Sequence, residues 1–339
     1  MKILVTGGLG FIGSHTVVEL QNKGFEVVII DDLSNSSQEV LGRIASITGK
    51  EPLFEKMDLR EKGKVTDFFK RHQDVQGVIH FAASKAVGES VDKPLLYYEN
   101  NINSLVYILQ ELTQKEKAGF IFSSSCTVYG QADTMPITED APVKPAESPY
   151  GNTKQMGEEI IRDTCKVTPA LNAISLRYFN PMGAHPSAAI GELPIGVPQN
   201  LVPFITQTGV GLREQLSVFG DDYPTSDGTC VRDYIHVVDL AKAHVVALER
   251  LLAGKNKDNY EVFNVGTGTG STVLEVIKSF EKVSGKKLNY KIVDRRAGDI
   301  TSAYADTNKA NNILGWKAES TLDEAMKSAW DWELKVRNI

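Results

Sequence analysis

The sequence predicts an α/β fold built on a parallel β-sheet, and three observations support this prediction. Short apolar runs alternate with longer segments of helical periodicity. Most runs contain consecutive apolar residues, such as Ile3 to Val5, which is typical of strands covered by helices on both faces of a sheet. A glycine-rich turn, from Gly7 to Gly13, joins the first apolar run to the first helical segment. Together these features indicate a Rossmann-type, doubly wound parallel sheet followed by a smaller C-terminal α/β region.

The elements of the first half alternate regularly between strand and helix. Residues 133–149 contain four prolines, which predict an irregular loop across the entrance of a site. Strands are expected at residues 2–6, 25–30, 52–56, 75–81, 119–123 and 171–176, and helices at residues 14–23, 62–72, 94–117 and 150–166.

The composition changes after Pro181, where residues 181–200 are rich in glycine, proline and alanine. We therefore expect a cofactor-binding domain at residues 1–180 and a smaller domain at 181–339. A helix is expected at 238–252, a strand at 260–265 and a C-terminal helix at 321–336. His185, Trp330 and Trp332 are interpreted as structural residues. The turn at 266–270 lacks the lysine of a phosphate loop, so it is interpreted as a strand-to-helix turn.

Size and composition indicate an ordinary globular protein. The chain has 339 residues, of which 42% are hydrophobic, so it can bury a substantial core. A net charge of -6 gives no general attraction to nucleic acid or to an anionic membrane. Three scattered cysteines are too few for a disulfide framework or a metal cluster, and they suit a reducing compartment. No apolar signal segment or membrane-length run is present, so we expect a cytoplasmic location.

The glycine turn predicts a dinucleotide site. Gly7, Gly10 and Gly13 let the backbone approach a pyrophosphate, whose charge the following helix N-terminus stabilises. The turn fits G-x-x-G-x-x-G and also G-x-G-x-x-G, so the pattern alone leaves the subclass open. Asp31 and Asp32 end the second strand, and an acid there accepts from ribose hydroxyls and repels a 2′-phosphate. This favours NAD over NADP.

Further polar residues fall at the carboxyl ends of the predicted strands, where ligands bind in open α/β sheets. Such residues also favour turns and caps regardless of function, so each is individually ambiguous. They are Asp58, the segment from Phe81 to Lys85, Asn100, and Ser123 to Ser125.

Tyr150 and Lys154 are the candidate catalytic pair. Residues four apart lie on one face of a helix, so both side chains can address the same atom. A free tyrosine has a pKa of about 10, and a cation at close range favours the phenolate that a general base requires. Tyr-x-x-x-Lys also occurs by chance, and it is the accompanying glycine turn and strand ends that favour a catalytic interpretation.

Arg295 and Arg296 form a pair in a predicted loop that ends at Asp299. Guanidinium groups bind phosphate bidentately, so the pair suits a diphosphate. A solvated basic turn is an equally good interpretation of the sequence alone.

Four motifs together resemble the extended short-chain dehydrogenase/reductase family. They are VTGGLGFIG from Val5, SSSCTVYG from Ser123, SPYGNTK from Ser148 and RYFNP from Arg177. Within that family, HFAASKAVGES from His80, GAHP from Gly183 and DGTCVRDYIH from Asp227 resemble the UDP-glucose 4-epimerases, and the match spans nearly the whole chain. The resemblance implies bound NAD, a UDP-hexose substrate and a homodimer packed through helices near residues 94–117 and 149–166. It also implies that a segment near 230–265 returns to the first domain.

The resemblance also implies roles for individual residues. The implied catalytic residues are Ser125, Tyr150 and Lys154. NAD contacts are implied for Phe11, Ile12, Asp31, Asp32, Leu33, Ser34, Asn35, Ser36, Asp58, Leu59, Phe81, Ala82, Ala83, Ser84, Lys85, Asn100 and Phe179, together with the catalytic three. UDP-sugar contacts are implied for Asn180, Asn200, Leu216, Ser217, Val218, Phe219, Arg232, Arg296 and Asp299, with Ser125 and Tyr150.

The implied activity is interconversion of UDP-glucose and UDP-galactose through a 4-keto intermediate, with Tyr150 as the base. Alternatives are an NAD-linked nucleotide-sugar dehydrogenase, a dehydratase, or a non-catalytic NAD-sensing protein. Related dehydratases have acidic residues just after the position of Ser125, where this chain has Cys126 and Thr127. NAD-sensing relatives often lose the tyrosine or the lysine, and both are present here.

Ala303 bears on the choice of sugar. It lies seven positions after Arg296, where some of these epimerases have a tyrosine that narrows the sugar pocket and others a small residue. Alanine leaves room for a 2-acetamido group, so UDP-GlcNAc and UDP-GalNAc are expected to be interconverted as well.

Overall fold

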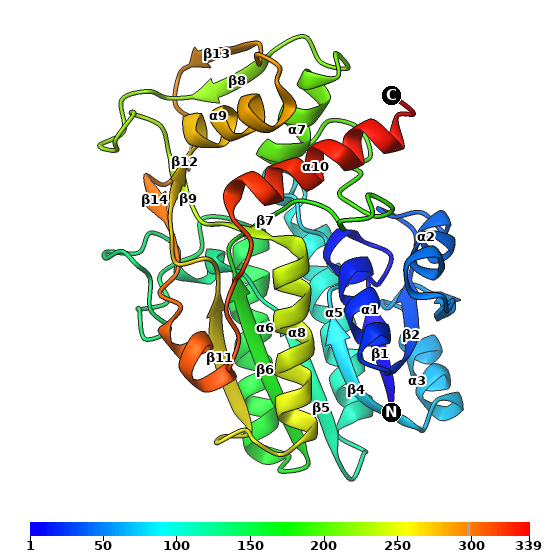
Figure 1. Ribbon diagram of the computed structural model, residues 1–339. Coiled ribbons are helices and arrows are strands. Elements are labelled where there is room, and N and C mark those ends of the chain that lie inside the picture. Colours follow the sequence, from blue (N-terminus) through cyan, green and yellow to red (C-terminus); the bar gives the residue numbers. More distant parts are fainter. Residues whose placement is uncertain (297–298) are drawn as a thin grey trace.

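A seven-stranded sheet forms the centre of the computed structural model, which describes residues 1–296 and 299–339 (Figure 1). The strand order is β11-β6-β5-β4-β1-β2-β3, and all neighbouring strands are parallel. This order confirms the predicted doubly wound, Rossmann-type fold. The strands are β1 (Lys2–Thr6), β2 (Glu26–Asp31), β3 (Leu53–Lys56), β4 (Val75–His80), β5 (Ala118–Ser123), β6 (Leu171–Tyr178) and β11 (Tyr260–Val265).

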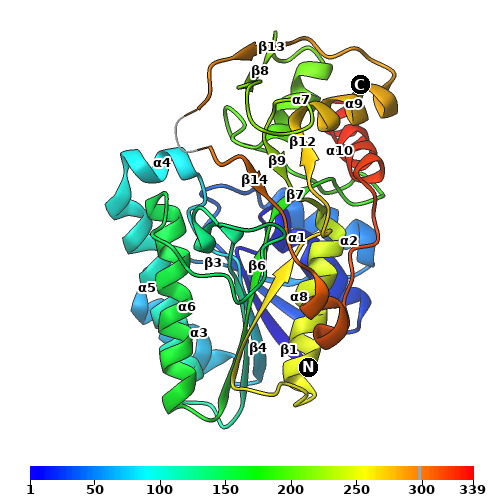
Figure 2. The same ribbon diagram turned by 90° about the vertical axis from the view of Figure 1, so that its left-hand side faces the viewer.

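Helices cover both faces of the sheet (Figure 2). Because side chains alternate along a strand, Ile3 and Val5 of β1 pack on one helical layer and Leu4 packs on the other. This is why successive residues of β1, such as Ile3, Leu4 and Val5, are all apolar. The first layer contains α1 (Phe11–Asn22), α2 (Glu39–Thr48) and α8 (Val237–Leu252), and the second contains α3 (Lys62–Arg71), α5 (Pro94–Leu112) and α6 (Pro149–Val167).

A second, smaller core lies beyond the carboxyl ends of the strands, at the top of Figure 1. Phe280 and Trp330 meet edge to face there, with ring centroids 5.2 Å apart. Trp332 is also buried, which agrees with the interpretation of both tryptophans as structural. The elements of this region are β7 (Asn180–Met182), α7 (Leu201–Gly209), β8 (Leu216–Phe219), β9 (Val231–Arg232), β10 (Tyr234–His236), β12 (Ser271–Thr272), α9 (Val273–Ser284), β13 (Tyr290–Val293), β14 (Ser302–Ala303) and α10 (Leu322–Val336).

The chain crosses between these two regions more than once. β11 pairs with β6 as the last strand of the large sheet, and α8 packs on the same sheet. A short π-helical turn, η2 (Ala310–Leu314), also packs against the core of the large sheet. The sheet therefore recruits segments far along the sequence.

Most predicted elements are present with small shifts in their ends. Helix α1 begins at Phe11, three residues earlier than expected, because the glycine turn leads directly into it. Helix α5 ends at Leu112 and not at residue 117. Helices α2, α4 (Val87–Asp92) and α7 and the 3-10 turn η1 (Cys126–Tyr129) were not predicted.

The proline-containing segment at 133–149 is irregular up to Ser148, as predicted. Within it, Ile137 forms an isolated bridge with Ala305 and packs beside Phe179. The segment thus lies against the carboxyl ends of β6 and β11. Across the described residues, no helix is long and apolar enough to span a membrane.

Candidate functional site

The glycine turn brings backbone from two strands into close contact. Gly7 has φ +66°, and a Cβ there would lie 2.8 Å from the nitrogen of Ala82. A Cβ on Gly13 would lie 2.2 Å from the carbonyl oxygen of Gly7, so neither position can carry a side chain. A Cβ on Gly8 would meet the side chain of Ile29 at 2.8 Å. Helix α1 begins at Phe11 and Ile12, leaving its first-turn amides directed toward any anion at the turn.

The two acids at the end of β2 have different surroundings. Asp31 is buried and accepts hydrogen bonds from the amide of Leu9 (3.1 Å), the amide of Leu33 (3.0 Å) and the hydroxyl of Ser36 (2.7 Å). It therefore ties the glycine turn to the loop after β2. Asp32 is partly exposed, and only its Oδ1 is engaged, by the amide and hydroxyl of Ser34; Asn35 is exposed beside them.

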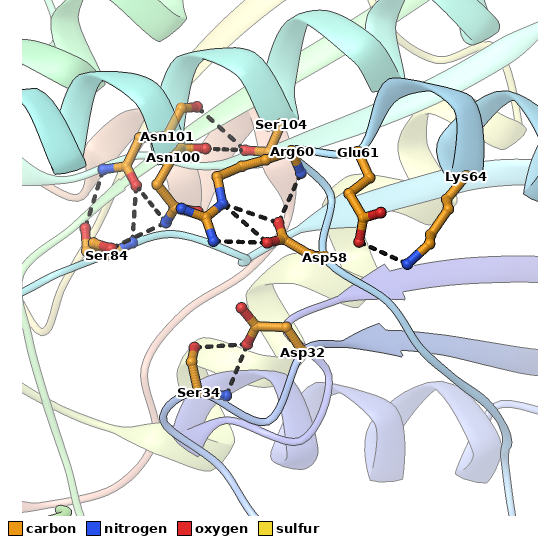
Figure 3. A network of polar contacts seen from close by, with 10 residues as sticks. All are labelled: Asp32, Ser34, Asp58, Arg60, Glu61, Lys64, Ser84, Asn100, Asn101 and Ser104. Atoms are coloured by element: carbon orange, nitrogen blue, oxygen red, sulfur yellow. Dashed lines mark hydrogen bonds and ion pairs between the residues drawn. The ribbon is translucent and has the colours of Figure 1, made fainter.

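Asp58 and Arg60 lie opposite Asp32 at the carboxyl end of β3 (Figure 3). The Arg60 guanidinium binds the Asp58 carboxylate bidentately, with Nη2 2.7 Å from Oδ2. These bonds lower the pKa of Asp58, so it is a carboxylate. Leu59 is buried in the core, so a ligand at this edge can reach only its backbone.

The loop after β4, Phe81 to Lys85, is fastened to helix α5. Asn101 accepts from the amide of Ser84 (2.8 Å) and donates to its carbonyl (3.0 Å). Asn100 donates to the hydroxyl of Ser84 (Figure 3). Asn101 also donates to Thr153 in α6, next to Lys154. The side-chain amide of Asn101 thus joins the loop to the helix of the candidate catalytic pair. No sequence motif predicted this link.

The N-terminus of α6 places Tyr150 and Lys154. The Ser148 hydroxyl accepts from the amide of Gly151 (3.2 Å) and Pro149 occupies the first turn, which are the usual residues for these positions. Lys154 Nζ donates to the carbonyl of Ser123 (2.8 Å) and lies 5.8 Å from the centre of the Tyr150 ring. The lysine and the phenol ring therefore lie close together at the end of β5.

Ser125 follows β5 and caps the turn η1, where its Oγ accepts from the amide of Thr127. Burial raises the pKa of Tyr150, and Ser125 is close enough to the phenol to oppose that rise. Cys126 is the next residue, and burial raises the pKa of its thiol to about 11. The thiol is therefore protonated near neutrality, and neither Cys126 nor Thr127 supplies a carboxyl group beside Ser125.

Burial shapes the titration of the pair. It raises the pKa of Tyr150 well above its ordinary value and lowers the pKa of Lys154 to about 8. The protein alone consequently keeps the phenol protonated near neutrality. A further positive charge beside Tyr150 would favour its phenolate.

Arg232, Arg296 and Asp299 meet in the second region. Asp299 Oδ1 lies 2.8 Å from Arg296 Nη2 and 3.8 Å from Arg232 Nη2. Arg296 lies over the ring of Phe219, 5.3 Å from its centre. Arg295 instead pairs with Asp222, so the two arginines serve different partners. Residues 297 and 298 of this predicted loop lie outside the described residues.

The other residues implied for substrate binding are distributed around this cluster. Leu216 and Val218 point into the core, so the side chains of β8 available to a ligand are Ser217 and Phe219. Ala303 is buried and packs with Phe179, and it lies opposite Arg232 where strands β14 and β9 pair. Asn180 pairs with Tyr234.

A salt bridge connects the two regions. Glu192 accepts from Asn200 Nδ2 (2.6 Å) and lies 3.6 Å from Lys85 Nζ. A residue implied for NAD binding and one implied for substrate binding thus share one carboxylate. Glu192 follows Gly191 in a proline-containing loop, and nothing in that pattern points to this role.

The turn at 266–270 holds a carboxylate from the protein itself. Buried Asp233 accepts from the amides of Thr267 (2.8 Å), Gly268 (3.1 Å) and Ala305 (3.2 Å). These amides are therefore engaged within the protein, as the strand-to-helix interpretation implies. His185 bonds Ser187 in its own loop, which suits a structural residue.

Comparisons with known proteins agree with this arrangement. The family model described as GDP-mannose 4,6 dehydratase matches residues 4–329. A UDP-glucose 4-epimerase of Bacillus subtilis is 52% identical over 333 residues, covering 98% of this chain and 97% of the relative.

Two solved structures are similar over their full length. UDP-glucose 4-epimerase from Stenotrophomonas maltophila, with bound NAD and formylated UDP-arabinopyranose, has a TM-score of 0.96 and 45% identity, covering 100% of this chain and 99% of that one. The Bifidobacterium longum enzyme, in complex with NAD and UDP, has a TM-score of 0.94 and 46% identity with the same coverage. The chain therefore belongs to the extended short-chain dehydrogenase/reductase family and, within it, to the UDP-glucose 4-epimerases.

Proposed function

We propose that this protein is an NAD-dependent UDP-glucose 4-epimerase that interconverts UDP-glucose and UDP-galactose. The observation that carries the proposal is the cluster of Ser125, Tyr150 and Lys154 at the carboxyl end of β5. The arginine and aspartate cluster of the second region supports a UDP moiety. The names and ligands of the similar structures point to the same activity.

The chain's own residues fit NAD. Gly7 and Gly13 let the turn pack closely on the backbone of Ala82 and on itself, ahead of the first-turn amides of α1 that suit a pyrophosphate. The acids at the end of β2 can accept from ribose hydroxyls. We assign the remaining contacts to the residues inferred from the sequence, from Asp31 to Ser36 and at Asp58, Leu59, Phe81 to Lys85, Asn100 and Phe179. NAD held by these residues would supply a positively charged ring able to accept a hydride reversibly.

Tyr150 then acts as a reversible base. Its phenolate takes the proton of the 4-hydroxyl while carbon 4 loses its hydride, leaving a 4-keto sugar. Ser125 hydrogen-bonds the same oxygen, and the Lys154 ammonium favours the phenolate. After the ketone presents its opposite face, Tyr150 returns the proton as the hydride returns, and the configuration at carbon 4 is inverted.

We infer that the second region holds the UDP part of the substrate. Arg232 and Arg296 offer guanidinium groups to the diphosphate, with Asp299 holding both in place. Asn180, Asn200 and the β8 strand complete this side of the site. On this basis residues 1–180 form the cofactor domain and 181–339 the substrate domain, with the segment near 230–265 contributing to the first.

An assay without added NAD tests the function. We expect purified protein incubated with UDP-galactose to yield UDP-glucose, because no net redox change occurs and the cofactor stays bound between turnovers. A dehydrogenase would instead stop after one equivalent unless NAD were added. Formation of a 4-keto-6-deoxy sugar would indicate a dehydratase, for which the neutral Cys126 and Thr127 offer no acid.

Ala303 is expected to admit an N-acetyl group. Its small side chain packs with Phe179 and pairs with Arg232, between the candidate nicotinamide and diphosphate sites. We expect the protein to interconvert UDP-GlcNAc and UDP-GalNAc, and Ala303→Tyr to remove this activity while UDP-galactose turnover continues. Nuclear magnetic resonance of the equilibrated sugars measures both. If the unmodified protein does not convert UDP-GlcNAc, then alanine at this position does not confer tolerance.

We further propose a homodimer packed through α5 and α6. Ile102 and Val106 of α5 and Met156 and Ile160 of α6 are four residues apart within each helix and only partly buried, so each pair presents an apolar stripe. We expect sedimentation equilibrium to give twice the chain mass, and Val106→Arg to give the single chain. A monomer for the unmodified protein at micromolar concentration would contradict the proposal.

A further inference from the structure

A buried ion pair lies directly beneath the proposed catalytic residues. Glu158 is one helical turn after Lys154 on α6, and Arg177 is on β6. The Arg177 guanidinium binds the Glu158 carboxylate bidentately, with Nε 2.9 Å from Oε1 and Nη2 2.6 Å from Oε2. Both residues are only 6% exposed. A buried fork of this kind costs desolvation energy and is weak evidence for a role in stability, so its position calls for another explanation.

The pair holds the strand end that carries Ser125. Glu158 Oε1 also accepts from the hydroxyl of Ser124 at 2.6 Å, and Ser124 is the residue before Ser125. Arg177 lies over the ring of Tyr129, 4.8 Å from its centre, at the end of the turn η1 that Ser125 caps. Glu158 therefore links α6, which carries Tyr150 and Lys154, to the segment after β5.

The carboxylate also lies in the charge environment of Lys154. Burial lowers the pKa of Lys154, and the negative charge of Glu158 opposes that shift. The other groups facing Lys154 are Tyr150 and, from β4, His80, whose pKa burial lowers to about 3, so it is neutral. Arg177 and, from β11, Tyr260 face Glu158.

We propose that Glu158 is a positioning residue for the Ser125, Tyr150 and Lys154 site, acting on Ser125 through Ser124 and on Lys154 through its charge. The inference rests on the proposed epimerase function. It predicts that the ion pair affects both the geometry and the pH dependence of proton transfer, whereas a purely structural pair affects neither.

Glu158→Gln tests the charge. Removing a negative charge lowers the pKa of neighbouring acids, so we expect both limbs of the kcat profile to move to lower pH by about one unit. The matched control is Glu261→Gln. Glu261 forms a similarly buried fork with Arg250 of α8, on the opposite face of the sheet from α6. Its loss removes a comparable ion pair without moving the profile.

Ser124→Ala tests the geometry in a variant that keeps the ion pair intact. We expect kcat to fall about 10- to 100-fold, because small displacements of reacting groups are costly, with an unmoved pH profile and little change in the KM for UDP-galactose. A kcat within twofold of the unmodified protein for Ser124→Ala, or a profile for Glu158→Gln that coincides with that of Glu261→Gln, overturns the proposal.

Tyrosinate absorbance provides a readout that does not need turnover. In protein with bound NAD, we expect the lowest tyrosinate midpoint to move to lower pH in Glu158→Gln and to stay in place in Glu261→Gln. If the unmodified protein has no epimerase activity but these shifts occur, the proposed function fails and the positioning role stands. If activity is present and the midpoints do not differ, the positioning role fails alone.

Discussion

Tyr150→Phe is expected to lower kcat by about 10²- to 10⁴-fold, the range typical of a lost general acid–base group, while NAD remains bound. The substitution removes only the phenolic oxygen that receives the sugar proton. The ring stays in its buried position and Lys154 keeps its hydrogen bond to Ser123, so the pocket has no cause to collapse. Bound NAD is measured by its absorbance after denaturation, and kcat by conversion of UDP-galactose.

Tyr178→Phe is the matched control for this variant. Tyr178 is close enough to Tyr150 to influence its pKa, and its hydroxyl bonds Ser123 at 3.1 Å. Removing that hydroxyl leaves the proposed proton path intact, so kcat stays within a few-fold of the unmodified protein. Near-normal turnover by Tyr150→Phe would exclude Tyr150 from the mechanism.

Lys154→Met is expected to be the second most damaging change, lowering kcat about 100-fold at neutral pH, because a nearby cation shifts a pKa by one to three units. Without the ammonium, the pKa of Tyr150 rises further, so the acid limb of the profile moves to higher pH. In the unmodified protein the cation is present below the Lys154 pKa of about 8 and is lost above it. Activity that depends on this cation therefore declines on the alkaline side.

Lys166→Met provides the comparison, because Lys166 is exposed at the other end of the same helix. Lys166→Met changes the net charge by the same amount, and we expect it to leave the pH profile of kcat unchanged. An acid limb that stays in place in Lys154→Met would mean that the lysine acts on NAD binding alone, which the content of bound NAD would also report.

The sheet and the dinucleotide turn were predictable because they depend on local patterns. An apolar run such as Lys2 to Thr6, followed by glycines and then by a helical segment, has few alternative folds. The same holds for the Tyr150 and Lys154 pair, since spacing along one helix brings them together. Helix α2 was not predicted, because it buries few residues, chiefly Leu41 and Ile44.

Other parts of the site depend on contacts between residues far apart in the chain. Glu192 forms an ion pair with Lys85, and Asp233 accepts hydrogen bonds from amides of the turn at 266–270. In both cases the partners are distant in sequence. Nothing local in the chain encodes these encounters. Glu158 is intermediate, because its spacing from Lys154 places it on the same helical face, but its partner Arg177 is found only once β6 lies beside α6.

Local sequence was thus sufficient to propose Tyr150 and Lys154 as the reacting groups, the strand ends that face the site and the cofactor, because each follows from periodicity or from a short motif. The electrostatic state of those groups was not accessible in the same way. Burial raises the pKa of Tyr150 and lowers the pKa of Lys154 to about 8. Burial is a property of the packed molecule. Folding excludes water from both side chains, so the proposed base depends on a second cation, which bound NAD would supply.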